Sequence, residues 1–83
     1  MRFFFHQQTG DGLLEDPDGT ELANIDAAIA EALVSARYLW ADAIVRQIDL
    51  TGETFEIADE AGRQVASVSF TDALPPSLRP GAK

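Results

Sequence analysis

The sequence predicts an α+β fold of the order β-β-α-β-β, in which one amphipathic helix packs on one face of a small, mostly antiparallel sheet. Two observations lead to this prediction. Residues 24 to 46 form the only long stretch with helical periodicity. Short segments rich in aromatic and β-branched residues, bounded by glycine, lie on both sides of it. Because one helix covers only one face of such a sheet, the other face should be left open.

The helical pattern runs from Asn24 to Arg46. Asn24 is a suitable N-cap, because its side-chain oxygen can accept a hydrogen bond from a free backbone N–H in the first turn. Asp26 and Arg46 carry the charges that the helix dipole favours at the two ends. At about 100° per residue, the larger apolar side chains fall on one broad arc, which should face the core. This arc comprises Ile25, Ile29, Ala32, Leu33, Ala36, Leu39, Trp40, Ala43 and Ile44.

A second, weaker apolar strip lies beside this arc and comprises Ala30, Val34, Ala41 and Val45. Two explanations stay open. In the first, either the helix is buried more deeply than usual or its valines are scattered on the surface. Alternatively, the strip contacts another subunit.

The predicted strands alternate apolar and polar side chains around glycine-containing turns. They span Arg2–Gln8, Leu13–Glu15, Thr54–Asp59 and Gln64–Phe70, with a hairpin loop at Glu60–Arg63. We expect the helix-facing side to carry Phe3, Phe5, Phe55, Ile57, Ala66, Val68 and Phe70. The opposite face should carry Phe4, His6, Glu56, Val65, Ser67 and Ser69.

An open sheet face with Phe4 beside Val65 would expose apolar surface. A partner chain would cover it, and so would the Leu74–Leu78 segment if it folded back. We favour the partner, although antiparallel sheets often tolerate one face in water. The predicted interface therefore comprises Phe4, His6 and Val65 on the sheet and Val34, Ala41 and Val45 on the helix.

Composition limits the class of protein. The 83 residues are enough for one domain, predicted over residues 1–74, with the proline-rich residues 75–83 as an irregular, mobile tail. The absence of cysteine suits a reducing cytoplasm. The formal charge of −8 argues against nucleic acid and anionic membranes as partners, and it would suit a basic protein. No run of about twenty apolar residues predicts a membrane span.

The sequence indicates no catalytic, cofactor or metal site. His6 is the only histidine, so neither a histidine-based metal site nor a catalytic triad is expected, and a hydrogen bond to a neighbour is the simpler role. The acidic residues Asp11 to Glu21 include a calcium-loop-like Asp16-Pro17-Asp18-Gly19. Aligned on Gly19, the calcium template would require ligands at Leu14 and Ile25, so a solvated turn is the better interpretation.

Several segments together resemble a family. They are Phe3 to His6, the loop residues Asp16, Gly19, Glu21 and Leu22, the helix residues Ala28, Glu31, Ala32, Ser35, Ala36 and Arg37, the hairpin Asp59–Arg63, and Val68, Phe70, Asp72 and Ala73. In order and spacing this set resembles DUF6894, a family of small bacterial proteins catalogued only as a domain of unknown function. The family often has Pro-Asp before the helix, where this chain has Ala23-Asn24. The resemblance implies no activity, ligand or catalytic residue.

Two functions follow from these observations. The first is a non-enzymatic, cytoplasmic interaction module that forms a homodimer, with a basic protein as a further possible partner. The alternative is an accessory domain that binds a small ligand in a pocket between helix and sheet. The two differ in the surface they require, because an interface needs a flat apolar patch and a ligand needs a concave apolar pocket.

Overall fold

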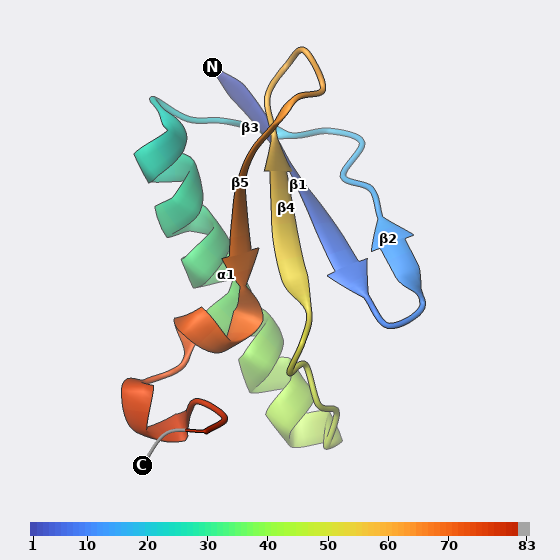
Figure 1. Ribbon diagram of the computed structural model, residues 1–83, viewed down its shortest axis with the longest axis vertical. Coiled ribbons are helices and arrows are strands. Elements are labelled where there is room, and N and C mark those ends of the chain that lie inside the picture. Colours follow the sequence, from blue (N-terminus) through green and yellow to red (C-terminus); the bar gives the residue numbers. More distant parts are fainter. Residues whose placement is uncertain (82–83) are drawn as a thin grey trace.

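The computed structural model describes residues 1–81, in which α1 (Ile25–Arg46) lies behind one face of a five-stranded antiparallel sheet (Figure 1). The strands are β1 (Arg2–Thr9), β2 (Gly12–Leu14), β3 (Thr20–Glu21), β4 (Thr54–Ala58) and β5 (Gln64–Ser69). Their order is β2-β1-β4-β5, and β3 pairs with the start of β1. The predicted α+β fold is therefore confirmed. The two-residue β3 was not predicted, because it is too short for an alternating pattern.

The ends of α1 follow from local chemistry. Asn24 caps the helix, since its Oδ1 accepts a hydrogen bond of 2.8 Å from the Ala27 N–H. At the other end Gln47 adopts a left-handed conformation, with φ of 58°, and its N–H donates to the carbonyl groups of Ala43 and Ile44. No glycine marks this end of the helix, because Gln47 takes the position that glycine usually fills.

Alanine accounts for four of the five buried residues of α1. Ala28, Ala32, Ala36 and Ala43 are buried, and Trp40 is the large side chain among them. The predicted core arc was therefore wrong at Ile25, Leu39 and Ile44, which are exposed. Small side chains allow the helix backbone to approach the sheet closely, so the helix turns its alanines inward.

Three large side chains are fully buried at the centre of the core: Phe3, Ile57 and Phe70. The rings of Phe55 and Phe70 lie 4.8 Å apart, and the indole N–H of Trp40 donates to the Phe70 carbonyl at 2.8 Å. Because Trp40 packs its ring and satisfies its polar atom in one place, it fixes α1 against the end of β5.

The face assignment fails at one residue of β5. A register irregularity between Ile57 and Ala58 pairs Ala58 with Gln64 and leaves Val65 without a partner across the ladder. Val65 is partly buried and packs against the core, so it does not lie on the open face as predicted. A bulge of this kind shifts the alternation of side chains by one residue.

The C-terminal segment has more regular structure than the sequence predicted. Phe70 begins a 3-10 turn, η1 (Phe70–Ala73), instead of ending β5, and a second turn, η2 (Pro76–Leu78), follows. Arg79 donates from its Nε to the Leu74 carbonyl and from Nη2 to the Asp72 carbonyl. Residues 82–83 of the predicted tail lie outside the described residues.

Within residues 1–81, no helix combines the length and the apolar character that a membrane crossing would require.

The alanine contact yields a test. Replacing buried Ala32 with leucine should lower the free energy of unfolding by about 1–3 kcal/mol, because the added atoms force the helix away from the sheet. Ala30→Leu on the exposed side of the same helix is the matched control and should change it by less than about 0.5 kcal/mol. Urea unfolding followed by circular dichroism measures both. Equal effects at the two positions would contradict the assignment of the buried face.

Candidate interaction surfaces

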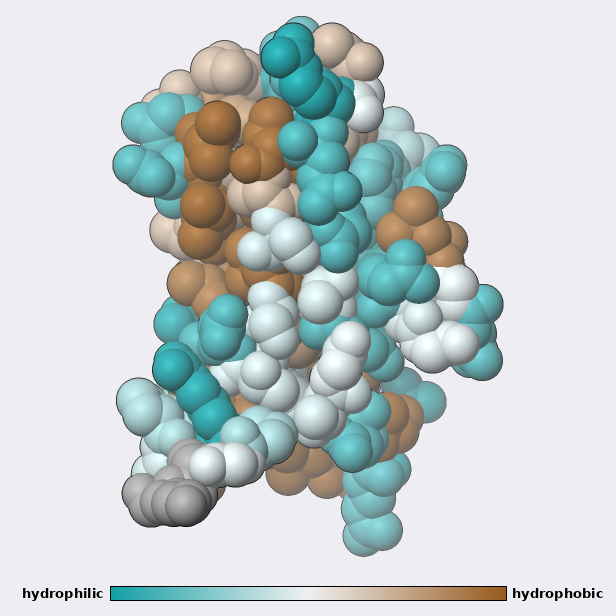
Figure 2. Space-filling view, in the orientation of Figure 1, coloured by the Kyte–Doolittle hydropathy of each residue, from teal (hydrophilic) through white to brown (hydrophobic). Residues whose placement is uncertain are grey.

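The open face of the sheet is mainly polar. In the orientation of Figure 1 this face is turned toward the viewer, and Figure 2 shows mainly pale and teal surface over β4, with brown surface at the border between β5 and α1 and over β2. The strand register assigns this face to Phe4, His6, Gln8, Thr54, Glu56, Ala58, Gln64, Ser67 and Ser69.

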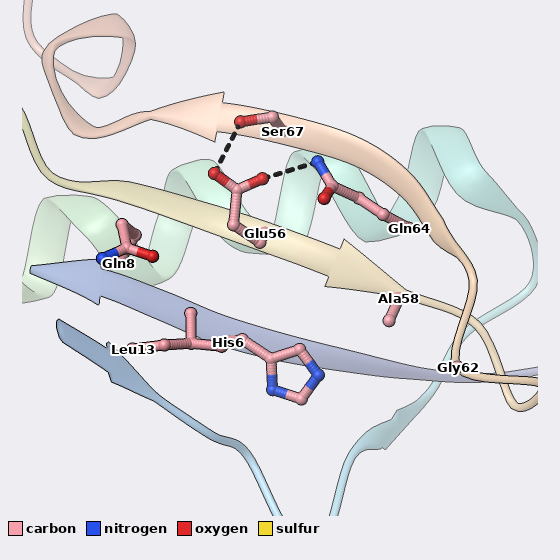
Figure 3. Close-up of a pocket in the computed structure, with 8 residues that line it drawn as sticks. All are labelled: His6, Gln8, Leu13, Glu56, Ala58, Gly62, Gln64 and Ser67. Carbon is pink, nitrogen blue, oxygen red and sulfur yellow. Dashed lines mark hydrogen bonds between the residues drawn. The ribbon is translucent and has the colours of Figure 1, made fainter.

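Glu56 lies at the centre of the open face and is held by its neighbours. Its Oε1 accepts hydrogen bonds from the hydroxyl groups of Thr54, at 2.7 Å, and Ser67, at 3.1 Å. Its Oε2 accepts from the Gln64 amide at 2.7 Å (Figure 3). A shallow hollow of about 540 Å³ surrounds it, lined by His6, Gln8, Leu13, Glu56, Ala58, Gly62, Gln64 and Ser67. These three donors are neutral, so the carboxylate keeps its negative charge, but they occupy three of its roughly four acceptor positions and leave about one for a ligand.

Asp16 closes a gap in the edge of β1. β3 pairs with Arg2 and Phe3, and β2 pairs with Gln7 to Thr9, so Phe5 lies between the two partner strands. The Asp16 Oδ2 accepts the Phe5 N–H at 3.1 Å and thereby replaces the missing strand. Its Oδ1 accepts the N–H groups of Asp18, at 3.2 Å, and Gly19, at 3.1 Å. The predicted turn with local side-chain-to-backbone bonds is confirmed, and it serves the sheet edge.

His6 is bound into the same loop. The Asp16 backbone N–H donates to His6 Nδ1 at 3.0 Å, which places the ring proton of the neutral side chain on Nε2. The predicted role of His6 as a strand histidine bonded to a neighbour is confirmed, although the donor is a backbone amide and not a carboxylic acid.

Phe4 is covered by its own chain. Its ring stacks on His6, with centroids 6.4 Å apart and an interplanar angle of 11°. On its other side lies Gly19, where an added Cβ would come within 2.9 Å of the Phe4 ring and of the Phe3 carbonyl. Neither a partner nor the Leu74–Leu78 segment is needed to explain its position. Phe4 is half-buried because the acidic loop folds over it, and this cover was not predicted.

The carboxyl group of Asp16 has a pKa below its ordinary value of 3.8. Partial burial opposes this shift by penalising the charge. The backbone N–H groups of Phe5, Gly19 and Asp18, together with the nearby His6, outweigh the burial. Because this pKa is lower in the folded state than in the unfolded state, the ionised carboxyl stabilises the fold at pH values above the ordinary pKa. This stabilisation is lost as the pH falls through the pKa of the folded state.

The pKa shift yields a second test. Asp16→Asn should lower the free energy of unfolding at pH 7 by about 1–3 kcal/mol, because the amide leaves backbone donors of the loop unsatisfied. The difference from wild type should shrink as the pH falls below 3.8 and through the lowered pKa of the folded carboxyl, because the wild-type group is then itself protonated. Asp18→Asn is the control, since the Asp18 side chain is exposed and should leave stability nearly unchanged. Urea titrations between pH 2.5 and 7 measure the effect. A constant difference across this range would contradict the role of the charge.

The remaining predicted polar residues serve local structure. Asp59 accepts the N–H groups of Ala61 and Arg63 at 3.0 Å and braces the β4–β5 hairpin, while Gly62 adopts a φ of 81°. Arg37 donates from its Nε to the Ala73 carbonyl. Among residues 1–81 no group of three histidine, cysteine or acidic side chains is arranged to hold a metal ion.

The outer surface of α1 carries apolar side chains that intramolecular packing leaves uncovered. Val34 and Val45, both predicted interface residues, have exposed fractions of 41% and 83%. Ala41, the third, is also exposed. Tyr38 lies between them with an exposed fraction of 75% and was missed, although its spacing of four residues from Val34 could have revealed it. We call Val34, Tyr38, Ala41 and Val45 the outer strip.

Comparison with known proteins gives a family but no precedent for function. The model of a family described as a domain of unknown function, DUF6894, matches residues 2–71. No curated protein and no solved structure matches the chain significantly.

Proposed function

Because the chain belongs to DUF6894, a family without an assigned function, we propose from its surface that it is a non-enzymatic interaction module that forms a homodimer through the outer strip. The exposure of this strip carries the proposal. Its members are spaced four, three and four residues apart, so they form one stripe along the helix. A spacing of this kind is typical of helices that pack against another helix.

The helix is apolar on two opposite sides. At 100° per residue the outer strip lies nearly opposite the buried Ala32, Ala36 and Ala43. A surface helix of a monomer usually presents charged residues at these positions. Here the charges border the strip instead, with Glu31 and Asp42 on one side and Arg37 on the other. An apolar strip bordered by charged residues is the pattern of a helix that is covered on both sides.

A second copy of the chain fits the strip in an antiparallel arrangement. In an antiparallel pair of helices centred between Leu39 and Trp40, Val34 of one copy faces Val45 of the other. In the same pair, Tyr38 of one copy faces Ala41 of the other. The large Tyr38 ring of each copy then lies over the small Ala41 of the other, as a two-fold interface requires. A parallel pair would place two Tyr38 rings against each other and two alanines across a gap, which packs less well.

The charge of the protein opposes the dimer at long range. Each copy carries a formal charge of −8, so two copies repel each other, and salt should weaken the repulsion. The contact of two short helices is also smaller than a typical stable interface, so association should be weak and reversible. The same acidic surface would favour a basic protein as a second partner.

The dimer is tested by sedimentation velocity at protein concentrations from 5 to 500 µM, in 50 and 300 mM NaCl. We expect the average mass to rise with concentration, more steeply at the higher salt. Tyr38→Glu and Val45→Glu should each keep the protein monomeric, because they place a carboxylate in the apolar contact. Leu14→Glu is the control, since Leu14 is also an exposed apolar residue, with an exposed fraction of 60%, but lies on β2. A wild-type monomer at every concentration and both salts would contradict the proposal.

The orientation is tested separately with cysteine variants, which the cysteine-free chain makes unambiguous. In a mixture of Val34→Cys and Val45→Cys proteins, a short thiol cross-linker should join the two variants to each other. Each variant alone should cross-link poorly. Efficient cross-linking of Val34→Cys with itself would indicate a parallel pair and contradict the antiparallel arrangement.

A further inference from the structure

A second apolar surface on α1 forms a hollow of about 570 Å³ between the C-terminal half of the helix and the segment from η1 to Arg79. The apolar lining comes from Trp40, Ala41, Ile44, Ala73, Leu74, Pro75, Pro76 and Leu78. This volume lies within the range of pockets that bind small molecules. The hollow is separate from the helix–sheet contact, where the ligand pocket of the alternative function was expected.

Two arginine residues lie next to this apolar lining. Arg37 comes from α1 and Arg79 from the C-terminal segment, and both line the hollow. The whole chain has only six lysine and arginine residues against fourteen acidic ones, so two cations at one apolar hollow are unusual for its composition.

The arginines are held in place by the backbone. Arg37 donates from Nε to the Ala73 carbonyl at 3.2 Å, and Arg79 donates from Nε to the Leu74 carbonyl at 3.2 Å and from Nη2 to the Asp72 carbonyl at 3.1 Å. Each guanidinium has five N–H donors, so these bonds leave Nη donors on both side chains for another acceptor. No ion pair joins either guanidinium to a carboxylate within residues 1–81.

From this arrangement we propose that the hollow binds a small molecule with an apolar chain and a carboxylate head. The apolar chain would lie on Trp40, Ile44 and Leu78, and the carboxylate would accept hydrogen bonds from Arg37 and Arg79. Guanidinium groups bind carboxylates through paired, charge-assisted hydrogen bonds, which supports a carboxylate over an alcohol or an amine. Asp72, which also lines the hollow, disfavours more highly charged anions. The argument for this site does not rest on the proposed dimer, although Ala41 belongs to both surfaces.

Trp40 is a natural spectroscopic reporter of binding in this hollow. Trp40 is the only tryptophan, lines the hollow and donates its indole N–H to the Phe70 carbonyl. Binding should therefore change both the fluorescence of Trp40 and the chemical shift of its indole N–H. The probes are decanoate, decanol and decylamine, each titrated below its critical micelle concentration into the wild-type protein.

We expect decanoate to shift the Trp40 indole signal in a saturable way. Decanol and decylamine should bind at least about tenfold more weakly than decanoate. A loss of this size is expected when a charged hydrogen-bond partner is removed. Arg37→Gln and Arg79→Gln should each weaken decanoate binding by about tenfold and leave decanol binding unchanged. Arg46→Gln, on the same helix but paired with Asp42, is the matched control and should bind decanoate like wild type.

Arg79→Gln removes contacts that hold the C-terminal segment, so a variant that leaves the arginines intact is also needed. Leu78→Glu serves this purpose, because Leu78 lines the hollow yet has an exposed fraction of 65%, and its new carboxylate should repel decanoate. The proposal is overturned if decanoate does not shift the Trp40 signal, if decanol binds as tightly as decanoate, or if Leu78→Glu binds decanoate like wild type.

Discussion

The close contact between the alanines of α1 and the sheet determines the rest of this structure. Ala28, Ala32 and Ala36 follow each other at intervals of four residues and are fully buried. They allow the helix to lie close to the aromatic core formed around Phe3 and Phe70. Because alanines take four of the five buried positions of α1, several of its larger apolar residues, such as Val34 and Tyr38, lie outside the core. The outer strip and the hollow beside Trp40 both result from this arrangement, because each contains apolar side chains that are not buried in the core.

The sheet has a different constraint, which lies at the edge of β1. Two short strands, β2 and β3, pair with the two ends of β1 and leave Phe5 between them without a strand partner. A backbone N–H without a partner destabilises the fold where water is excluded, and the Asp16 carboxylate supplies the acceptor. The same loop then covers Phe4 and binds His6, so the open face needs no partner to bury its aromatic ring. This arrangement moves the candidate interface from the sheet to the helix.

Much of the fold could be predicted from the sequence because its signals are local. The Asn24 cap, the alternation of Phe3 and Phe5, and the Gly62 turn each depend on neighbouring residues. The errors arose where distant segments meet. The burial of alanine over isoleucine depends on how closely helix and sheet approach. The inward position of Val65 depends on a bulge, and the cover of Phe4 depends on a loop twelve or more residues away. For the candidate site, spacing was enough to indicate Val34, Ala41 and Val45, but only the structure shows that Tyr38 completes the strip and that Arg37 and Arg79 line the same hollow.

The central claim is that the outer strip is open to water in one chain and is covered when two chains meet. Solvent paramagnetic relaxation of methyl signals tests it most directly, with a soluble gadolinium chelate added to protein at 20 µM and at 1 mM. The account predicts that the methyl groups of Val34 and Val45 are strongly relaxed at the low concentration and protected at the high one, while those of exposed Leu14 are relaxed equally at both. Valine methyl groups that stay equally accessible at both concentrations would contradict it.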